Sequence, residues 1–177
     1  MLSSEESLKI LKKTSALIEG HFILSSGLHS SKYVQCAQLM SKPHLANKIC
    51  ESLAEKIKNV FADFDLILSP AMGGIIIGYE IGRLLGKETI FTERVSNEFH
   101  LRRDFKIKNG TKVLIIEDVI TTGKSSLECS KLVTFNKGTI AGYACIIDRS
   151  NGKSAIKDKI VSQVKLNIPT FSKENLP

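Results

Sequence analysis

The stretch "VLIIEDVITTGKSS", residues 113–126, decides how this chain folds. Four apolar residues run directly into Glu117 and Asp118, and two threonines, a glycine and a lysine follow. A short, continuous apolar run of this kind is typical of a strand that is buried on both faces of a parallel sheet. The two carboxylates then fall at the carboxyl end of a buried strand, which is where open α/β sheets bind ligands.

The residues after the acids have the features of an anion site. Residues 121–123 lead into a predicted helix whose first turn, residues 124–126, presents free backbone N–H groups, hydroxyls and the positive end of a helix dipole. Carboxylates accept hydrogen bonds in pairs, so they suit vicinal sugar hydroxyls, and they can also hold a divalent cation. Together the acids and the start of the helix predict a binding site for a ribose 5-phosphate.

Two other interpretations of the same stretch exist. The letters "GKS" resemble part of a Walker A loop, but that pattern requires a glycine where this chain has Asp118, whose charge would repel the phosphates. The plainer alternative is a strand end that emerges into solvent with two charges, followed by an ordinary helix.

Strands and helices alternate on both sides of this stretch. Further apolar runs are "FDLILSP" (64–70), "ETIFTE" (88–93) and "TIAGYACIID" (139–148). The segments 71–86 and 123–138 have helical patterns, and Gly86 and Gly138 are the expected ends of these helices. This order predicts an α/β fold with a mostly parallel sheet that helices cover on both faces.

The N-terminal part has a different pattern. Ser3 and Glu6 form a capping-box motif, and Leu8, Leu11, Ala16 and Leu17 or Ile18 follow at helical spacing. Residues 20–36 are rich in Ser and Gly and suit a loop or an irregular ribbon. Pro43 suits the first turn of a second helix, whose apolar face would be Leu45, Ile49, Leu53, Ala54 and Ile57.

Composition limits the organisation and location of the protein. A chain of 177 residues that is 42% apolar and has no linker-like tract predicts one domain, 1–177, with a helix and hood segment at 1–40 and a core at 41–177. No window approaches a membrane span, and charges stand where a signal peptide needs apolar residues, so we expect a cytoplasmic protein without a membrane partner. The four cysteines lack metal-site spacing and are interpreted as reduced packing residues.

The net charge of +7 favours a polyanionic ligand. Lys and Arg are scattered, aromatic residues make up only 6% of the chain, and no nucleic-acid-binding signature is present. We therefore expect a small polyanion and no nucleic acid as the partner.

The acidic pair and its loop resemble the phosphoribosyl-pyrophosphate (PRPP) motif of the type I phosphoribosyltransferases. With "GHFILSSGLHSSKYVQCAQLM", "SPAMGGIIIGYEIGRLLG", "RRDF" and "IIDRS", nearly the whole chain resembles the orotate phosphoribosyltransferase family in order and spacing. The resemblance implies the type I phosphoribosyltransferase fold with a small N-terminal hood. It also implies transfer of a phosphoribosyl group from PRPP to orotate, with magnesium, in pyrimidine synthesis.

The resemblance assigns roles to residues of this chain. The PRPP-binding set is Glu117, Asp118, Val119, Ile120, Thr121, Thr122, Gly123, Lys124 and Ser125. Orotate would contact Thr121 and Arg149, whose guanidinium can face the orotate carboxylate in a fork. Residues Ala71, Met72, Gly73 and Gly74 resemble the pyrophosphate loop, although a tight strand-to-helix turn explains these glycines nearly as well.

The chain departs from the long-loop members of the family in its cations. Where those members carry lysines, this chain has Ser25 and Gly73, and residues 89–104 contain no lysine. The segment "ERVSNEFHLRRDF" resembles a shorter-loop branch with arginines and one histidine. We expect Asp118, Arg94 and His100 to be catalytic, with Arg94 on pyrophosphate and His100 as an acid.

The resemblance further implies a homodimer, and Mg²⁺ that is held mainly by PRPP rather than by a protein metal site. Two other functions stay open at this point. One is a phosphoribosyltransferase for another nucleobase, and the other is a non-enzymatic regulator of the same fold that senses PRPP.

Overall fold

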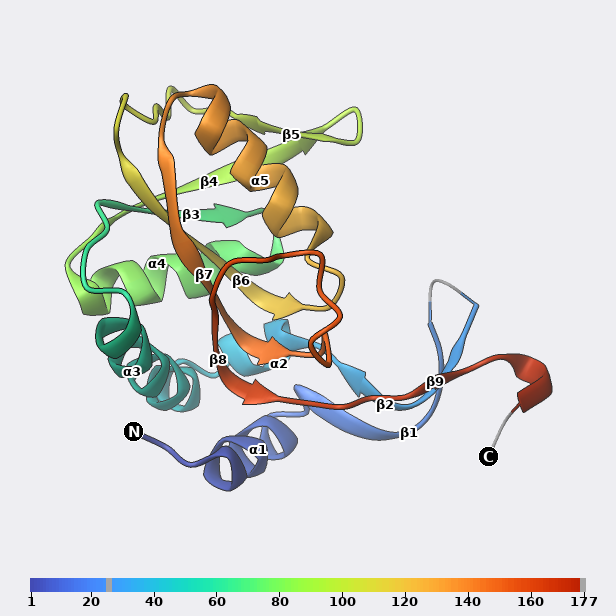
Figure 1. The fold of residues 1–177 in the computed structure, drawn as a ribbon. Coiled ribbons are helices and arrows are strands. Elements are labelled where there is room, and N and C mark those ends of the chain that lie inside the picture. The colour runs from blue at the N-terminus through green and yellow to red at the C-terminus, as the bar shows by residue number, and fades with distance from the viewer. Residues whose placement is uncertain (25–26, 176–177) are drawn as a thin grey trace.

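The centre of the molecule is a six-stranded sheet in the order β5-β4-β3-β6-β7-β8 (Figure 1). The computed structural model describes residues 1–24 and 27–175. Every neighbouring pair in this sheet is parallel except β4 and β5, which form an antiparallel hairpin. The strands are β3 (Leu66–Pro70), β4 (Glu88–Val95), β5 (Glu98–Leu101), β6 (Lys112–Ile120), β7 (Thr139–Asp148) and β8 (Ile160–Lys165).

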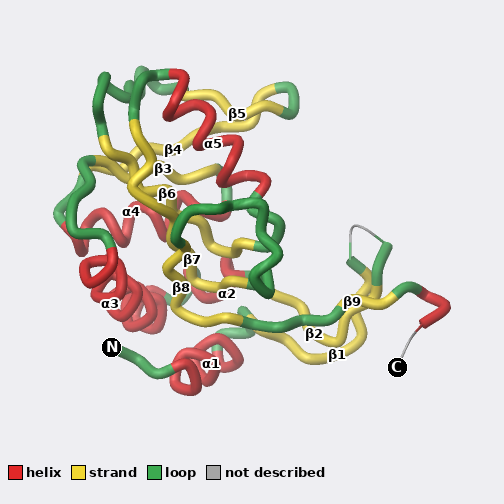
Figure 2. Tube along the Cα trace, viewed as in Figure 1, coloured by secondary structure: helices red, strands yellow, loops and turns green. Residues whose placement is uncertain are grey.

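Helices cover both faces of this sheet, as the sequence predicts (Figure 2). On β6, Leu114 and Ile116 pack into a core with α3 (Pro43–Val60) and α4 (Gly73–Leu85). Val113 and Ile115 point the other way and pack with α5 (Lys124–Phe135). Since side chains alternate along a strand, a continuous apolar run such as this one requires cover on both sides. The predicted α/β class with a mostly parallel sheet is confirmed.

A second, smaller sheet corresponds to the expected hood. Strands β1 (Leu17–Ile23) and β2 (His29–Val34) pair antiparallel, with an irregularity between Glu19 and Phe22, so the predicted irregular ribbon is confirmed. Its third strand, β9 (Thr170–Phe171), comes from far along the chain, as does the short helix η1 (Lys173–Asn175) beyond it. The hood sheet therefore takes a strand from outside 1–40, while the division into a single domain stays a prediction.

The first helix, α1 (Ser4–Lys13), has the predicted capping box. The Glu6 N–H donates to Ser3 Oγ (3.1 Å) and the Ser3 N–H donates to Glu6 Oε2 (2.8 Å). The expected continuation of its apolar face to Leu17 or Ile18 is wrong, because the helix ends at Lys13 and both residues begin β1. The Thr14 hydroxyl bonds back to the Ile10 carbonyl and Ser15 takes a positive φ of 60°, which turns the chain out of the helix.

Two other helix ends test the sequence patterns. Gly86 ends α4 in the left-handed conformation (φ 64°), as predicted. The prediction that Gly138 ends α5 is wrong, because Lys137 takes the left-handed conformation (φ 61°). The Gly138 N–H instead donates to the Val133 carbonyl (2.9 Å), which completes a Schellman-type end.

Between β2 and β3 there are two helices rather than the predicted one. The short helix α2 (Cys36–Met40) was not predicted, whereas Pro43 does occupy the first turn of α3. All five residues expected on the apolar face of α3 are buried, and all four cysteines are buried and unpaired, as expected. Within the described ranges, no helix is long and apolar enough to cross a membrane.

Candidate active site

Glu117 and Asp118 lie at the carboxyl end of β6, between β3 and β7. Because the strand alternates, their side chains point to opposite faces of the sheet. The Asp118 carboxylate lies against Gly73 at the start of α4, whereas Glu117 lies on the side of α5, where its charge adds to the burial that raises the pKa of Cys129. The two acids thus straddle the strand end and reach a ligand from two sides.

Both carboxylates are half-buried. Burial raises the pKa of Glu117 to about 8, and the charge of Asp118 adds to this shift. Burial also raises the pKa of Asp118, although the Val119 N–H, 2.9 Å from Oδ1, partly opposes the shift. Neither carboxylate forms an ion pair with any residue that the structure describes. Desolvated acids without a cationic partner are typical of functional sites.

The predicted pyrophosphate loop touches this acidic end. It joins β3 to α4, contains a cis peptide between Ala71 and Met72, and is fixed to β4 by the bond from the Ala71 N–H to the Thr92 carbonyl (2.9 Å). A Cβ atom on Gly73 would lie 2.7 Å from Asp118 Oδ2, so only glycine allows the loop backbone to approach this closely. Two segments far apart in the sequence therefore form one surface.

The predicted phosphate loop follows β6 and begins α5. Gly123 has a φ of 80°, and a Cβ atom there would lie 2.6 Å from Ser154 Oγ. The Ala155 N–H donates to the Thr122 carbonyl (3.0 Å), so the segment behind the loop fixes its shape. Val119 and Ile120 complete the strand, Thr121 and Thr122 are exposed, and Ser125 is half-buried.

Lys124 is unusual for the first residue of a helix. A positive charge at the positive end of the helix dipole is unfavourable by about 0.3–1 kcal/mol, and the first turn of α5 contains no acidic residue to compensate. An anion bound in front of this turn would attract both the lysine and the positive end of the helix, and would so offset this cost. The lysine therefore supports the prediction of a phosphate site.

Arg149 follows β7 and lies beside this loop, because its N–H donates to the Ile120 carbonyl (2.8 Å). Its Nε atom is buried and has no hydrogen-bond partner in the part of the chain that the structure describes, and burial lowers the pKa of the guanidinium. Arg149 as a whole is half-buried, and its buried Nε–H carries a desolvation cost that a carboxylate ligand can offset. The structure thus brings the backbone of Arg149 to Ile120, the residue before Thr121, and the orotate contacts themselves stay a prediction.

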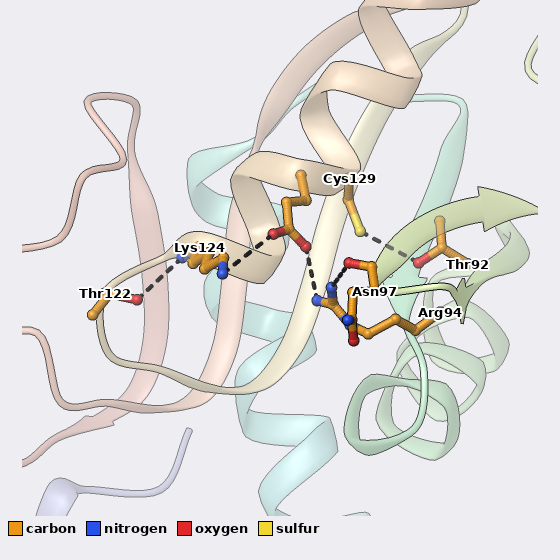
Figure 3. Close-up of polar contacts among 7 residues, drawn as sticks. Thr92, Arg94, Asn97, Thr122, Lys124 and Cys129 are labelled. Carbon is orange, nitrogen blue, oxygen red and sulfur yellow. Dashed lines mark hydrogen bonds and ion pairs between the residues drawn. The ribbon is translucent and has the colours of Figure 1, made fainter. Parts of the chain in front are cut away.

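The predicted cations of the β4–β5 hairpin are engaged differently. The Arg94 guanidinium donates to Glu128 Oε2 (2.7 Å) and to the Asn97 carbonyl (2.6 Å). Figure 3 draws these contacts as dashed lines. His100 is exposed and pairs in register with Glu93, on the opposite face of the hairpin from Arg94. Glu93 also accepts hydrogen bonds from Arg102 and Arg103. Arg94 lies on the α5 face of the sheet and Asp118 on the α4 face, so the structure does not bring these two together.

Sequence reasoning missed three contributions to the site. Cys36 of α2 backs the acidic end, with its Sγ 4.0 Å from the Asp118 carbonyl oxygen. Ser154 packs against Gly123 of the phosphate loop, and Glu128 pairs with Arg94. The only local signal was the spacing of Glu128 four residues after Lys124 on α5. Ser25, which the resemblance matches to a lysine of the long-loop members, lies outside the described residues.

Comparison with known proteins shows the family to which this chain belongs. The model of the phosphoribosyl transferase domain matches residues 36–175, and the chain therefore belongs to the phosphoribosyltransferase family. Within that family it groups with the orotate phosphoribosyltransferases. It is 43% identical to the orotate phosphoribosyltransferase of Erythrobacter litoralis (strain HTCC2594) over 177 residues, covering 99% of this chain and 92% of that protein.

Solved structures share the fold. The orotate phosphoribosyltransferase of Aeropyrum pernix superposes with a TM-score of 0.77 at 24% identity, over 89% of this chain and 92% of that one. The adenine phosphoribosyltransferase of Thermoanaerobacter pseudethanolicus has a TM-score of 0.67 at 20% identity, over 76% and 88% of the two chains. Since proteins named for different bases share this fold, the choice of base depends on side chains at the site.

Proposed function

We propose that this protein is an orotate phosphoribosyltransferase, which transfers the phosphoribosyl group of PRPP to orotate and releases orotidine 5′-monophosphate and pyrophosphate in pyrimidine synthesis. The single observation that carries this proposal is the position of Arg149 next to Ile120 of the phosphate loop, with a buried Nε atom that has no hydrogen-bond partner among the described residues. An arginine fork is complementary to the carboxylate that distinguishes orotate from neutral bases. The 43% identical relative supports the same choice of base.

Each part of the site has a role in this reaction. Residues 119–125 anchor the 5-phosphate, while Glu117 and Asp118 accept hydrogen bonds from the ribose hydroxyls on two sides of the strand end. Residues 71–74 then lie under the pyrophosphate, beside Asp118. Holding both ends of the sugar aligns its C1 atom for attack by the orotate nitrogen as the bond to pyrophosphate loosens.

Negative charge builds on the leaving pyrophosphate, so catalysis requires cations. Each well-placed donor is worth about 3 kcal/mol in the transition state. The candidates on the hairpin are Arg94 and His100, with Arg102 and Arg103 nearby, and we retain Arg94 and His100 as the proposed catalytic groups together with Asp118. Because Arg94 is paired with Glu128 of its own subunit, we propose that its contact with pyrophosphate is made at another subunit's site.

Magnesium fits this site in the way the family uses it. Glu117 and Asp118 offer hard oxygen donors that carry no cation partner among the described residues. We propose that PRPP holds the ion for the most part, with Asp118 as the nearest protein carboxylate. When bound, Mg²⁺ neutralises charge on the pyrophosphate.

We also propose that the protein acts as a homodimer. Met72, Ile76 and Tyr79 form a stripe on one side of α4, with 85%, 56% and 66% of their surfaces exposed. A contiguous apolar stripe beside the pyrophosphate loop suits a second copy of the chain, which would close the edge of the site. The cytoplasmic location expected from the sequence stays a prediction.

The proposed reaction is tested by following orotate absorbance after PRPP and Mg²⁺ are added to the purified protein. We expect loss of orotate with release of pyrophosphate. Adenine, hypoxanthine, uracil and xanthine are run in parallel. Reaction of one of these bases with orotate untouched would contradict the base assignment, and PRPP binding with no reaction for any base would favour the regulator.

The base pocket is tested by Arg149→Ala. Removal of a charged, two-pronged contact should raise the KM for orotate by about 10- to 100-fold and change the KM for PRPP far less. Steady-state kinetics with each substrate varied in turn gives both values. An equal loss for the two substrates would show that Arg149 supports the loop instead of binding the base.

A further inference from the structure

One carboxylate joins the phosphate loop to the β4–β5 hairpin. Glu128 lies one turn after Lys124 on α5, and its side chain is 25% exposed. Its Oε2 atom accepts a hydrogen bond from Arg94 at 2.7 Å, and its Oε1 atom lies 3.9 Å from Lys124 Nζ (Figure 3). A cation of the phosphate loop and a cation of the hairpin therefore share the same acid.

Arg94 in turn fixes the shape of the hairpin. Its guanidinium lies 4.0 Å from the centre of the Phe99 ring and donates to the Asn97 carbonyl at 2.6 Å. Ser96 and Asn97 form the turn, both with positive φ. The three contacts of Arg94 thus link the turn, the strand β5 and helix α5, and the contact with the helix depends on Glu128.

The two ion pairs of Glu128 differ in strength. At 3.9 Å the contact with Lys124 is long, and the lysine side chain is 80% exposed, so a dianion in the loop competes for this ammonium effectively. Once Lys124 turns to a bound phosphate, Arg94 is the remaining cation beside Glu128. Glu128 then interacts with Arg94 alone and no longer with Lys124. The hairpin, which carries Arg94, is therefore held more firmly against α5.

We propose that Glu128 is a positioning residue that couples occupation of the phosphate loop to the order of the β4–β5 hairpin. The proposal rests on the proposed function, because it takes the anion to be the 5-phosphate of PRPP. It adds a route by which substrate binding reaches the segment that carries His100, Arg102 and Arg103, without contact between that segment and the phosphate. Such coupling is the difference between the free energy of ordering the hairpin with PRPP bound and without it, so it can be measured directly.

The test is hydrogen exchange of the full-length protein with and without PRPP and Mg²⁺, read by mass spectrometry over residues 94–101. In the wild-type protein we expect PRPP to slow exchange there by at least about fivefold. In Glu128→Gln, which keeps the shape of the side chain and removes its charge, this protection should be lost while PRPP still binds. Protection of the same size in the variant, or none in the wild type, would overturn the proposal.

Kinetics and a matched control complete the experiment. Glu128→Gln should lower kcat by about tenfold with little change in the KM for orotate, since the hairpin acts after the base is bound. Glu80→Gln is the control, because it breaks another Glu–Arg pair of 2.7 Å with a side chain of similar exposure (19%), on α4. It should keep the protection of the hairpin, and loss of protection in this control would also count against a specific role for Glu128.

The two proposals fail in different ways. If PRPP does not protect the hairpin while orotate is converted, the coupling is wrong and the proposed function stands. If PRPP protects the hairpin and orotate is not converted, the proposed function is wrong and the coupling stands.

Discussion

Glu117 is the residue whose environment has the clearest effect on how the stability of the fold depends on pH. Its pKa of about 8 in the folded protein is above the ordinary value of 4.5, so the folded state binds a proton that the unfolded state releases. The associated stability is fully present below about pH 4.5 and is lost as the pH rises toward 8. Asp118 shifts in the same direction, because it is buried at the same strand end.

We therefore predict that the free energy of unfolding falls between pH 5 and pH 8, and that Glu117→Gln removes much of this fall. A neutral amide has no charge to desolvate, so the variant should gain about 1–3 kcal/mol relative to wild type at the upper pH. Urea denaturation at the two pH values gives both free energies. An identical pH profile in the variant would show that another group takes up the proton.

At the scale of elements, the connection between β3 and α4 packs tightly against the end of β6. Gly73 is exposed and does not require a positive φ, so its conformation alone would allow alanine. The obstacle is the Asp118 carboxylate, 2.7 Å from the added Cβ. The glycine is therefore required by the neighbouring acid rather than by its own backbone.

This contact predicts that Gly73→Ala separates activity from stability. Alanine reduces the entropy of the unfolded chain and favours the start of α4, so stability should stay within about 1 kcal/mol of wild type. Displacement of Asp118 should lower kcat/KM by about 100-fold, because small shifts of positioning groups are costly. Thermal denaturation and the orotate assay test the two parts, and normal turnover would show that Asp118 is not held at the reacting centre.

At the scale of the whole molecule, the exposed stripe on α4 is the surface that a second copy would cover. We predict that Tyr79→Asp yields a monomer, because a charge in a buried interface is strongly unfavourable. Light scattering after size-exclusion chromatography gives the mass. Phe135→Asp is the control, since Phe135 is 84% exposed on α5 and lies outside the stripe. A dimer that survives Tyr79→Asp would place the interface elsewhere.

The sequence by itself determined the features that depend on neighbours along the chain. The run before Glu117 specified a strand covered on both faces, the capping box of Ser3 began a helix, and Gly86 ended another. The acids and the helix start after them predicted the location of the site. Local patterns misled at the ends of α1 and α5, and they gave no signal for the short helix α2.

Only the tertiary structure decided the contacts between distant segments. The placement of Asp118 against Gly73, the pairing of Arg94 with Glu128 and the addition of β9 to the hood depend on strand order and register. The alternation of a strand also separated Glu117 and Asp118, which are adjacent in sequence, onto opposite faces of the sheet. Propensity and spacing act over a few residues, whereas these contacts follow from how whole elements pack, and that is why the sequence located the site and the fold decided its geometry.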